Sequence, residues 1–488
     1  MATIKEDAKI LEVLTSLSKQ RGFVFQSSEI YGGLGSTWDY GPLGVELKRN
    51  IKNLWWHNIV IARENIVGMD ASILMHPKVW EASGHVENFH DPLVDNKISK
   101  KRYRLDHLLE EQADEVIENL VKFFSIDSSL EEELKTQAIV SALLKKEDSS
   151  GDTLKECGVI DSHTKEVGDW TNTRQFNLMF KTNIGPVSDS SSIAYLRPET
   201  AQGIFVNYLN AQTTSRQKIP FGIAQIGKAF RNEITTGNFI FRTREFEQME
   251  MEFFCKLDET SKWLEYWSLE RMKWFESLGI NKKNLRLRAH GDDELAHYSS
   301  ACYDIEYKFD FGWSELEGIA DRGTYDLEQH IKHSGKKLAY FDQPNNEHFV
   351  PAVVESSAGV DRALLTILAD AFTQEDVNGE SRTVLKLSPK IAPIKVAVFP
   401  LMNKNNMPEI SQKIVDNIQS AGIASFFDAG GSIGKRYRRQ DEAGTPFGIT
   451  VDHDTLEDNT ITLRDRDTMK QERIPIDQLV EILKKKLV

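Results

Sequence analysis

FRNEITTGNFIFRTREFEQMEMEFF, residues 230–254, is the most informative stretch of this sequence. Apolar and polar positions roughly alternate on either side of ITTGN, which predicts two strands joined by a glycine-containing turn. Because side chains alternate between the two faces of a strand, we expect Arg231 and Glu233 to share a face. The predicted hairpin strands carry the charged residues Arg231, Arg242, Arg244, Glu245, Glu247, Glu250 and Glu252.

This hairpin has two interpretations. Charges of both signs on paired strands can form a solvated ladder of cross-strand ion pairs. Alternatively the hairpin binds a ligand, because a guanidinium grips a phosphate through two hydrogen bonds and an aromatic ring stacks on a nucleobase. Arginines concentrated beside Phe241 and Phe246 favour the ligand-binding interpretation.

Two other stretches point the same way. In ESSAGVDR, residues 355–362, a strand is predicted to turn at Gly359 into a buried helix whose first turn contains Arg362. A cation there opposes the helix dipole unless an anion binds nearby, although a surface arginine after a glycine turn is the simpler interpretation. In YLRPETAQG, residues 195–203, an X-Pro turn is expected to hold Glu199 at the mouth of a helix.

The remaining sequence divides by composition. Residues 96–170 contain two segments of helical period rich in Glu and Lys, and we expect a helical insertion there. Pro389 and Pro393 precede about a hundred residues in which strands and helices alternate, which predicts a small α/β domain. The predicted parts are 1–95 and 171–391, which together form one domain, the insertion 96–170, and the C-terminal domain 392–488.

Bulk properties narrow the class of protein. Of 488 residues 40% are hydrophobic and 27% charged, and no apolar stretch approaches the roughly 20 residues that span a bilayer. The first residues lack a basic region followed by an apolar one, so we expect no export signal. Cys157, Cys255 and Cys302 are isolated, which predicts a reduced, cytoplasmic protein without a membrane partner.

Net charge is −14, yet Lys435, Arg436, Arg438 and Arg439 form a local basic cluster. Nucleic acids respond to local patches rather than to net charge, although a solvated loop explains such a cluster equally well. His85 and His90 resemble metal ligands, but no cysteine or correctly spaced histidine accompanies them, so structural histidines are favoured. Cys302 is expected to be a small inert hydrophobic residue.

Taken together, these stretches resemble the signature motifs of class II aminoacyl-tRNA synthetases. GPLGVELKRN, residues 41–50, is similar to motif 1, the hairpin to motif 2 and GVDR to motif 3. SSEIYGGLGSTWDYGPLG, ILMHPKVWEASGH, YRLDHLLEE, LRPETAQGIFVNY and FRTREFEQMEMEFF resemble the dimeric α2 glycyl-tRNA synthetase family. DAGGSIGKRYRRQDEAGTPFGITVD resembles that family's anticodon-binding domain, so the likeness covers nearly the whole chain.

The resemblance implies an α+β fold: a class II antiparallel sheet flanked by helices, a helical insertion and a C-terminal α/β anticodon-binding domain. It implies a glycine–tRNA ligase that activates glycine with ATP to glycyl-adenylate and transfers it to the 3′ end of tRNA(Gly). Mg²⁺, a homodimer formed through motif 1 and diadenosine tetraphosphate synthesis as a side activity are implied as well.

The resemblance also assigns residues. Arg231, Glu233 and Arg362 are the implied catalytic residues. Arg231 is expected to hold the α-phosphate and the glycine carboxylate, and Arg362 to clamp the γ-phosphate. Adenine is expected to stack between Phe246 and Arg362 while Glu233 reads its amino group. The implied ATP-binding set is Arg231, Asn232, Glu233, Phe241, Arg242, Thr243, Arg244, Glu245, Phe246, Glu315, Leu316, Gly359, Val360, Asp361 and Arg362, with Glu315 as the Mg²⁺ ligand.

A glycine site must grip an ammonium group with acids and fill the side-chain space with protein, because even one extra methyl group is then excluded. We therefore expect no editing domain. The implied glycine-binding residues are Arg104, Glu199, Phe246, Glu247, Gln248, Met249, Glu250, Glu355, Ser356, Ser357, Ala358 and Gly359. The implied tRNA-binding residues are Lys435, Arg436, Arg438 and Arg439.

Two alternatives stay open at this stage. A non-enzymatic relative that only binds nucleic acid would be expected to lose Arg231, Glu233 or Arg362, and all three are present. A class II enzyme for proline, threonine or histidine shares the C-terminal domain type but has different amino-acid motifs.

Overall fold

The computed structural model describes residues 10–146, 148–186, 192–234, 237–291 and 299–487. Its centre is a seven-stranded sheet in the order β11-β12-β13-β16-β10-β9-β3. Every pair in the sheet is antiparallel except β3 with β9. The strands are β3 (Ile66–Gly68), β9 (Phe221–Phe230), β10 (Glu245–Cys255), β11 (Leu285–Ala289), β12 (Ala301–Phe309), β13 (Gly312–Gly323) and β16 (Ala352–Gly359). The predicted antiparallel sheet is confirmed.

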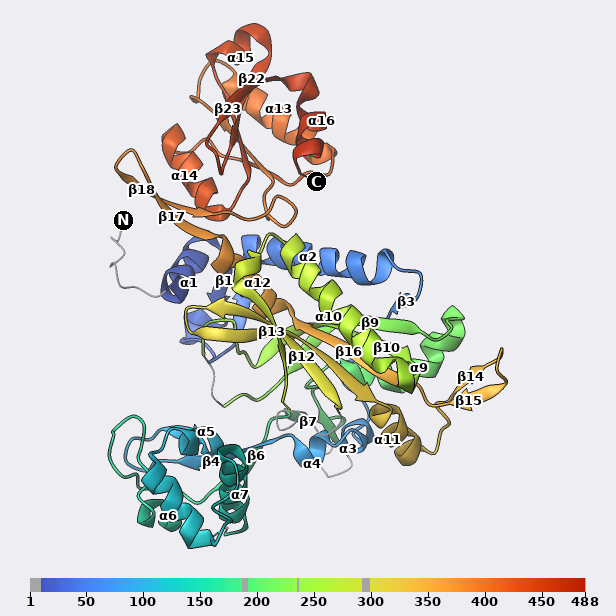
Figure 1. Ribbon diagram of the computed structural model, residues 1–488. Coiled ribbons are helices and arrows are strands. Elements are labelled where there is room, and N and C mark those ends of the chain that lie inside the picture. The colour runs from blue at the N-terminus through green and yellow to red at the C-terminus, as the bar shows by residue number, and fades with distance from the viewer. Residues whose placement is uncertain (1–9, 147, 187–191, 235–236, 292–298, 488) are drawn as a thin grey trace.

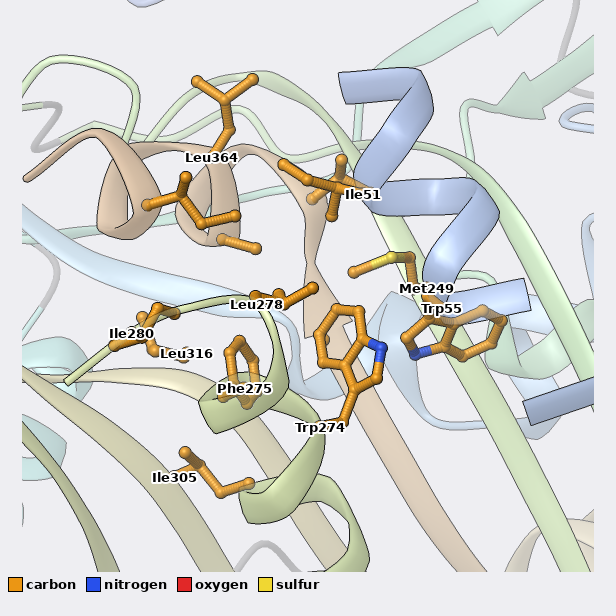
Figure 2. Packing of buried hydrophobic residues seen from close by; sticks show 14 of the residues in the cluster. Ile51, Trp55, Met249, Trp274, Phe275, Leu278, Ile280, Ile305, Leu316 and Leu364 are labelled. Carbon is orange, nitrogen blue, oxygen red and sulfur yellow. The ribbon is translucent and has the colours of Figure 1, made fainter. Parts of the chain in front are cut away.

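Three helices cover one face of this sheet: α2 (Pro42–Trp56), α10 (Thr260–Ser277) and α12 (Val360–Ala371). Figure 2 shows Ile51 and Trp55 of α2, Trp274 of α10 and Leu364 of α12 gathered with Met249 of β10. This apolar layer fixes the phase of β10. Because side chains alternate, burying Met249 here turns its neighbours in sequence to the opposite face.

On the opposite face of the sheet, two helices cover one end. There α9 (Ala201–Ser215) and α11 (Tyr325–Ser334) pack on apolar residues of β9, β10 and β16, among them Phe221, Phe254 and Val353. The first turn of α9 therefore lies next to the polar residues of β10. As predicted, Glu199 lies at the mouth of this helix, next to its N-cap residue Thr200.

The pairing of β9 with β10 confirms the predicted hairpin but not the predicted strand ends, and Thr235 and Thr236 of the predicted turn lie outside the described residues. Phe230 pairs with Glu245, so Arg231, Arg242 and Arg244 lie beyond the ends of the paired strands rather than on them. The backbone N–H of Arg231 donates to the carbonyl of Arg244 at 2.9 Å. The next backbone N–H, that of Asn232, donates to Leu178 at 2.7 Å instead of continuing the ladder.

The insertion contains helices, as expected, but its body also includes a sheet, and two strands of that sheet lie outside the predicted bounds 96–170. The helices are α5 (Leu105–Glu110), α6 (Asp114–Phe124), α7 (Glu132–Lys145) and α8 (Ser150–Glu156). They share a separate apolar cluster that runs from Val94 to Trp170. Three strands at its base pair in the order β5-β4-β6, namely β4 (His90–Asp95), β5 (Arg102–Arg104) and β6 (Arg174–Asn177). This body lies below the central sheet in Figure 1.

The C-terminal body lies above the central sheet in Figure 1 and has its own core. Its sheet order is β20-β19-β21-β22-β23, with β19 parallel to both neighbours and the remaining pairs antiparallel. The elements are β19 (Val396–Pro400), α13 (Met407–Ser420), β20 (Ser425–Phe427), α14 (Ile433–Ala443), β21 (Phe447–Val451), α15 (His453–Asp458), β22 (Thr460–Asp465), β23 (Gln471–Pro475) and α16 (Leu479–Lys486). The predicted α/β alternation is confirmed.

A hairpin of β17 (Phe372–Val377) and β18 (Glu380–Leu385) connects the two bodies. Arg382 of this hairpin donates to Asp441 of α14 at 2.9 Å. The other elements are α1 (Ile10–Arg21), β1 (Val24–Gln26), η1 (Glu29–Tyr31), β2 (Trp38–Tyr40), η2 (His57–Ile61), α3 (Lys78–Ala82), α4 (His85–Asn88), β7 (Lys181–Asn183), β8 (Ile193–Tyr195), η4 (Leu257–Glu259), η5 (Lys282–Asn284), β14 (Tyr340–Asp342), β15 (Glu347–Phe349) and η6 (Ile476–Gln478). Within the described ranges, no helix is long and apolar enough to span a bilayer.

Candidate active site

A cavity of about 310 Å³ opens on the sheet face opposite α2, α10 and α12. The loop after β9, the start of β10, and strands β13 and β16 contribute most of its walls. The residues that line it are Glu199, Arg231, Glu233, Ile240, Phe241, Arg242, Thr243, Phe246, Gln248, Glu250, His290, Ser299, Cys302, Asp304, Glu315, Leu316, Gly318, Ala320, Glu355, Ser357, Gly359, Asp361 and Arg362. The three predicted stretches thus meet in one place.

Arg231 is held in a fixed orientation at this cavity. Its Nε donates to the carbonyl of Pro198 at 3.0 Å. Its guanidinium carbon lies 5.3 Å from the ring centre of Phe246 and 5.6 Å from that of Phe89. A guanidinium packed against two rings and anchored through Nε is held in place at the cavity, which suits it to bind an anion.

Arg362 occupies the first turn of α12, as predicted. It donates through Nη1 to a carboxylate oxygen of Glu315 at 3.1 Å and through Nε to the carbonyl of Phe241 at 3.2 Å. Its guanidinium packs on the ring of Phe241 at 4.4 Å. Desolvation disfavours the charged form of Glu315, but Arg362, with Arg231 and His290, holds the pKa of that carboxyl below its ordinary value.

Carboxyl groups gather at the other end of the cavity. Glu250 accepts a hydrogen bond from Thr200, Glu199 accepts one from Gln202 at 3.1 Å, and Glu355 pairs with Arg322. Burial, and then Glu355 and Glu199, raise the pKa of Glu250 to about 8. The pKa of Glu355 is also raised, by burial first, although Arg322 opposes the shift. Such a cluster stabilises a bound cation such as an ammonium group.

Strand alternation divides the predicted glycine-binding residues between the two faces of the sheet. Phe246, Gln248 and Glu250 face the cavity, and so do Glu355, Ser357 and Gly359. The side chains of the residues between them face the helical layer and do not line the cavity. Met249 and Ala358 are in the apolar core, Ser356 donates to buried Glu317, and Glu247 pairs with Lys48 and Lys52.

Other predicted residues surround the cavity without lining it. Val360 is buried in the apolar core, and Glu245 pairs with Lys228 at the start of the hairpin. Arg244 donates to the carbonyls of Gly35 and Glu233, at 2.9 Å and 3.2 Å. Arg104 lies on the insertion, where it pairs with Asp106 and with Asp91. Asn232 is also outside the lining set.

Glu315 and Leu316 both border the cavity, but the side chain of Leu316 belongs to the apolar layer, where Figure 2 shows it with Phe275 and Ile280. A hard cation bound with phosphates prefers carboxylate oxygens, and Glu315 offers one beside Asp304 in the same cavity.

Sequence reasoning missed several polar and aromatic residues at this site. His290 and Asp304 line the cavity and lie 2.7 Å apart, and Cys302, expected to be an inert hydrophobic residue, lines it beside them. Burial, and then Asp304, raise the pKa of Cys302 to about 12, so it stays a thiol. Phe89 packs on Arg231, and His85 lies 3.4 Å from Glu199. The one available signal was the pair of histidines near Phe89.

The basic cluster of the C-terminal body lies on α14 rather than in a loop. Lys435 is exposed, whereas Arg436 is 3% exposed and donates to the carbonyls of Pro400 and Gly431. The prediction that Arg436 contacts tRNA is therefore corrected, because its hydrogen bonds serve the domain's own backbone. Arg438 lies 3.8 Å from Glu380, and Arg439 pairs with Asp428 at 2.6 Å.

Three segments of the chain match described protein families. Residues 180–371 match the tRNA synthetase class II core domain (G, H, P, S and T), which covers the cavity. Residues 91–127 match glycyl-tRNA synthetase insertion domain 1, and residues 395–486 match an anticodon binding domain.

Whole-chain relatives agree with these matches. A glycine–tRNA ligase of Thermus thermophilus is 49% identical over 507 residues, which cover 98% of this chain and 99% of the relative. A glycine–tRNA ligase of Chlorobaculum tepidum is 51% identical over 97% of this chain and 99% of its own length. One of Staphylococcus epidermidis is 52% identical over 98% of this chain and 99% of its own.

Proposed function

Because the chain belongs to the glycine–tRNA ligase family of class II aminoacyl-tRNA synthetases, we propose that the cavity beside β10 activates glycine with ATP. The family's reaction joins glycine to tRNA, and class II enzymes use ATP as a substrate. The single observation that carries the assignment is the arrangement of charge: Arg231 and Arg362 border the same cavity as the acids Glu199, Glu250 and Glu355. The two arginines suit phosphates and a carboxylate, and the three acids suit an ammonium group.

In the first step a glycine carboxylate oxygen attacks the α-phosphorus of ATP, and the bond to pyrophosphate breaks. Little covalent work falls to the protein, so positioning and charge neutralisation supply the rate. We assign Arg231 to the α-phosphate and the glycine carboxylate, because its packing against two rings and its hydrogen bond to Pro198 hold the guanidinium in place. Arg362 is assigned to the γ-phosphate. In the second step a ribose hydroxyl of tRNA attacks the glycyl carbonyl and releases AMP.

Adenine recognition is assigned to Phe246, Arg362 and Glu233. Arg362 packs on Phe241 at 4.4 Å, which leaves no room for a base between those two groups. A base that stacks on Arg362 therefore takes the guanidinium face opposite Phe241. Glu233, which borders the cavity, is the proposed acceptor for the adenine amino group.

Mg²⁺ is the expected companion of ATP in this family. Glu315 is its proposed protein ligand, since its carboxylate borders the cavity and Arg362 keeps it ionised. The ion would neutralise charge on the phosphates, and the phosphate oxygens would complete its coordination.

Glycine is proposed to place its ammonium group among Glu199, Glu250 and Glu355. Ser357, which receives a hydrogen bond from Gln248 at 3.2 Å, is proposed to border the α-carbon. A site filled in this way rejects larger amino acids sterically, so an editing domain is not needed.

A homodimer is proposed from the residues near motif 1. Ile30 and Tyr31 are each 87% exposed, and Leu34 and Val45 are also exposed. Exposed apolar side chains in one region favour burial against another protein, and a second copy of this chain is the proposed partner.

Three further proposals concern tRNA binding, location with side activity, and the division into domains. We propose that Lys435, Arg438 and Arg439 contact tRNA(Gly). We also propose that the protein is cytoplasmic and that it synthesises diadenosine tetraphosphate as a side activity. The proposed domain division is 1–95 with 171–391, 96–170 and 392–488. Separate apolar clusters for the insertion and the C-terminal body support that division.

The test of the proposed activity is amino-acid-dependent exchange of labelled pyrophosphate into ATP, run with Mg²⁺ across all standard amino acids. Exchange with glycine alone is expected. Exchange with a different amino acid would overturn the assigned pocket but keep the class II reaction. Silence with every amino acid from folded protein would favour a non-enzymatic relative.

A further inference from the structure

His85 stands outside the three motifs yet reaches the acid cluster. It begins the short helix α4 (His85–Asn88), directly after Gly84, whose φ is +81°. Its Nε2 lies 3.4 Å from Glu199 Oε2, and both side chains are 12% exposed. The rings of Trp80 and Phe89 pack against the imidazole, each 5.5 Å away between ring centres. The imidazole is therefore confined beside the carboxylate.

The second ring nitrogen of His85 has a defined partner as well. Nδ1 lies 2.8 Å from the hydroxyl oxygen of Ser83, which is itself buried. When the Ser83 hydroxyl donates to Nδ1, the neutral imidazole carries its proton on Nε2 and presents it to Glu199. The Ser83 hydroxyl oxygen also lies 3.3 Å from the carbonyl oxygen of Trp80, which is the longer of its two contacts. We therefore infer that Ser83 donates to Nδ1 and favours the tautomer that can donate to the carboxylate.

Glu199 is also held from its other side. Gln202 donates to Oε1 at 3.1 Å and to Asp326 at 2.9 Å, and its amide oxygen lies 2.9 Å from His330 Nε2. The neighbouring carboxyls Glu250 and Glu355 instead favour protonation of Glu199, because like charges close together disfavour ionisation. His85 and Gln202 are the described groups that hold its two oxygens.

We propose that His85 is a positioning residue for the amino group of glycine: it holds Glu199 charged and oriented toward the cavity, and Ser83 fixes its tautomer. The inference rests on the proposed role of Glu199 as a ligand of the glycine ammonium group. Glycine recognition then depends on a residue of the segment between β3 and the insertion, outside the hairpin and the motif 3 helix.

The test is pyrophosphate exchange by the full-length chain with His85→Ala, His85→Gln and Ser83→Ala. Inhibition by glycinol, which keeps the ammonium group and lacks the carboxylate, is measured in parallel. We expect His85→Ala to raise the KM for glycine and the inhibition constant of glycinol by the same factor, about tenfold, because a hydrogen bond to a charged group is lost. The KM for ATP should not change. The glutamine amide nitrogen can replace Nε2, so His85→Gln should recover most of the loss, and Ser83→Ala should show a smaller defect.

The matched control is His107→Ala, which removes an exposed histidine of α5. An unchanged glycine KM in His85→Ala would overturn the inference, as would equal rises in the KM values for glycine and ATP. If His85→Ala does not fold, the variants His85→Gln and Ser83→Ala still test the inference. A normal glycine KM in Ser83→Ala together with a large rise in His85→Gln would contradict the proposed tautomer. Glu199→Gln distinguishes the role of Glu199 from the role of His85. If Glu199→Gln leaves the glycine KM unchanged, the proposed function of Glu199 fails. If the glycine KM rises in Glu199→Gln but not in His85→Ala, only the role of His85 fails.

Discussion

Lys48 Nζ lies 2.8 Å from Asp361 Oδ1, so helix α2 is tied directly to the first turn of α12. Asp361 precedes Arg362 in sequence, and its other oxygen accepts from the backbone N–H of Glu247 at 2.8 Å. Tyr40 also donates to Asp361. The helix that resembles motif 1 thereby orients the arginine assigned to ATP.

Lys48→Met should destabilise the protein by about 3 kcal/mol, because it leaves a buried carboxylate without its cation. The kcat of pyrophosphate exchange should fall as well, since Asp361 loses the contact that orients α12. Urea unfolding and exchange kinetics measure the two effects. Lys52→Met is the control, because that side chain is 25% exposed and Glu247 keeps Lys48. Equal losses in the two variants would contradict the coupling.

Arg231→Ala should lower the kcat of exchange by roughly a hundredfold or more, as expected for the loss of a preorganised group that stabilises developing charge. Near-normal exchange in this variant would remove Arg231 from the mechanism. Phe89→Leu keeps an apolar side chain beside Arg231 but removes the ring face, so a smaller loss of kcat is expected with little change in the thermal midpoint.

Glycine binding should depend on pH through Glu250, whose pKa in the free protein is raised to about 8. The ammonium group binds the ionised carboxylate, so below pH 8 binding must release a proton. The KM for glycine should therefore fall as pH rises toward 8 and level off above it. Calorimetry in buffers of different ionisation enthalpy measures the released proton, and Glu250→Gln should abolish it.

Stability responds to the same group in the opposite sense. The pKa of Glu250 is higher in the folded protein than its ordinary value of 4.5, so its contribution is present below pH 4.5 and is lost as pH rises through about 8. Saturating glycine should offset this loss at alkaline pH. A thermal midpoint with the same pH dependence in Glu250→Gln and the parent chain would contradict the assignment.

Binding of tRNA should separate the residues of the α14 cluster. Lys435→Ala and Arg438→Ala should raise the KM for tRNA and reduce its salt dependence by about one phosphate contact each, with adenylate formation unchanged. Arg436→Ala should instead lower the stability of the C-terminal domain, because the carbonyls of Pro400 and Gly431 lose their donor. Equal loss of adenylate formation and tRNA charging in Lys435→Ala would contradict this division.

Discrimination against larger amino acids should be steric. Alanine and serine should support exchange at least tenfold less efficiently than glycine in kcat/KM, since one added methyl group in a filled site costs roughly 1–3 kcal/mol. Exchange with alanine comparable to that with glycine would refute a filled pocket.

Local sequence was sufficient to predict the hairpin, the strand that turns into α12 at Gly359, and the alternation of strands and helices in the last hundred residues. Each depends on neighbouring residues, through side-chain alternation, helical period and turn chemistry. The order of the motifs along the chain was likewise enough to identify the family.

Tertiary packing decided which half of each predicted set reaches the cavity. The phase of β10 follows from the apolar layer under α2, α10 and α12, which takes Met249 and leaves Glu250 on the other face. In the sequence, Arg436 looks as suitable for binding nucleic acid as Lys435. In the folded domain, however, Arg436 is buried because it donates hydrogen bonds to the carbonyls of Pro400 and Gly431. His85 reaches Glu199 although the two residues are 114 positions apart in the sequence. Contacts between distant segments depend on the whole chain's packing, which no local pattern encodes.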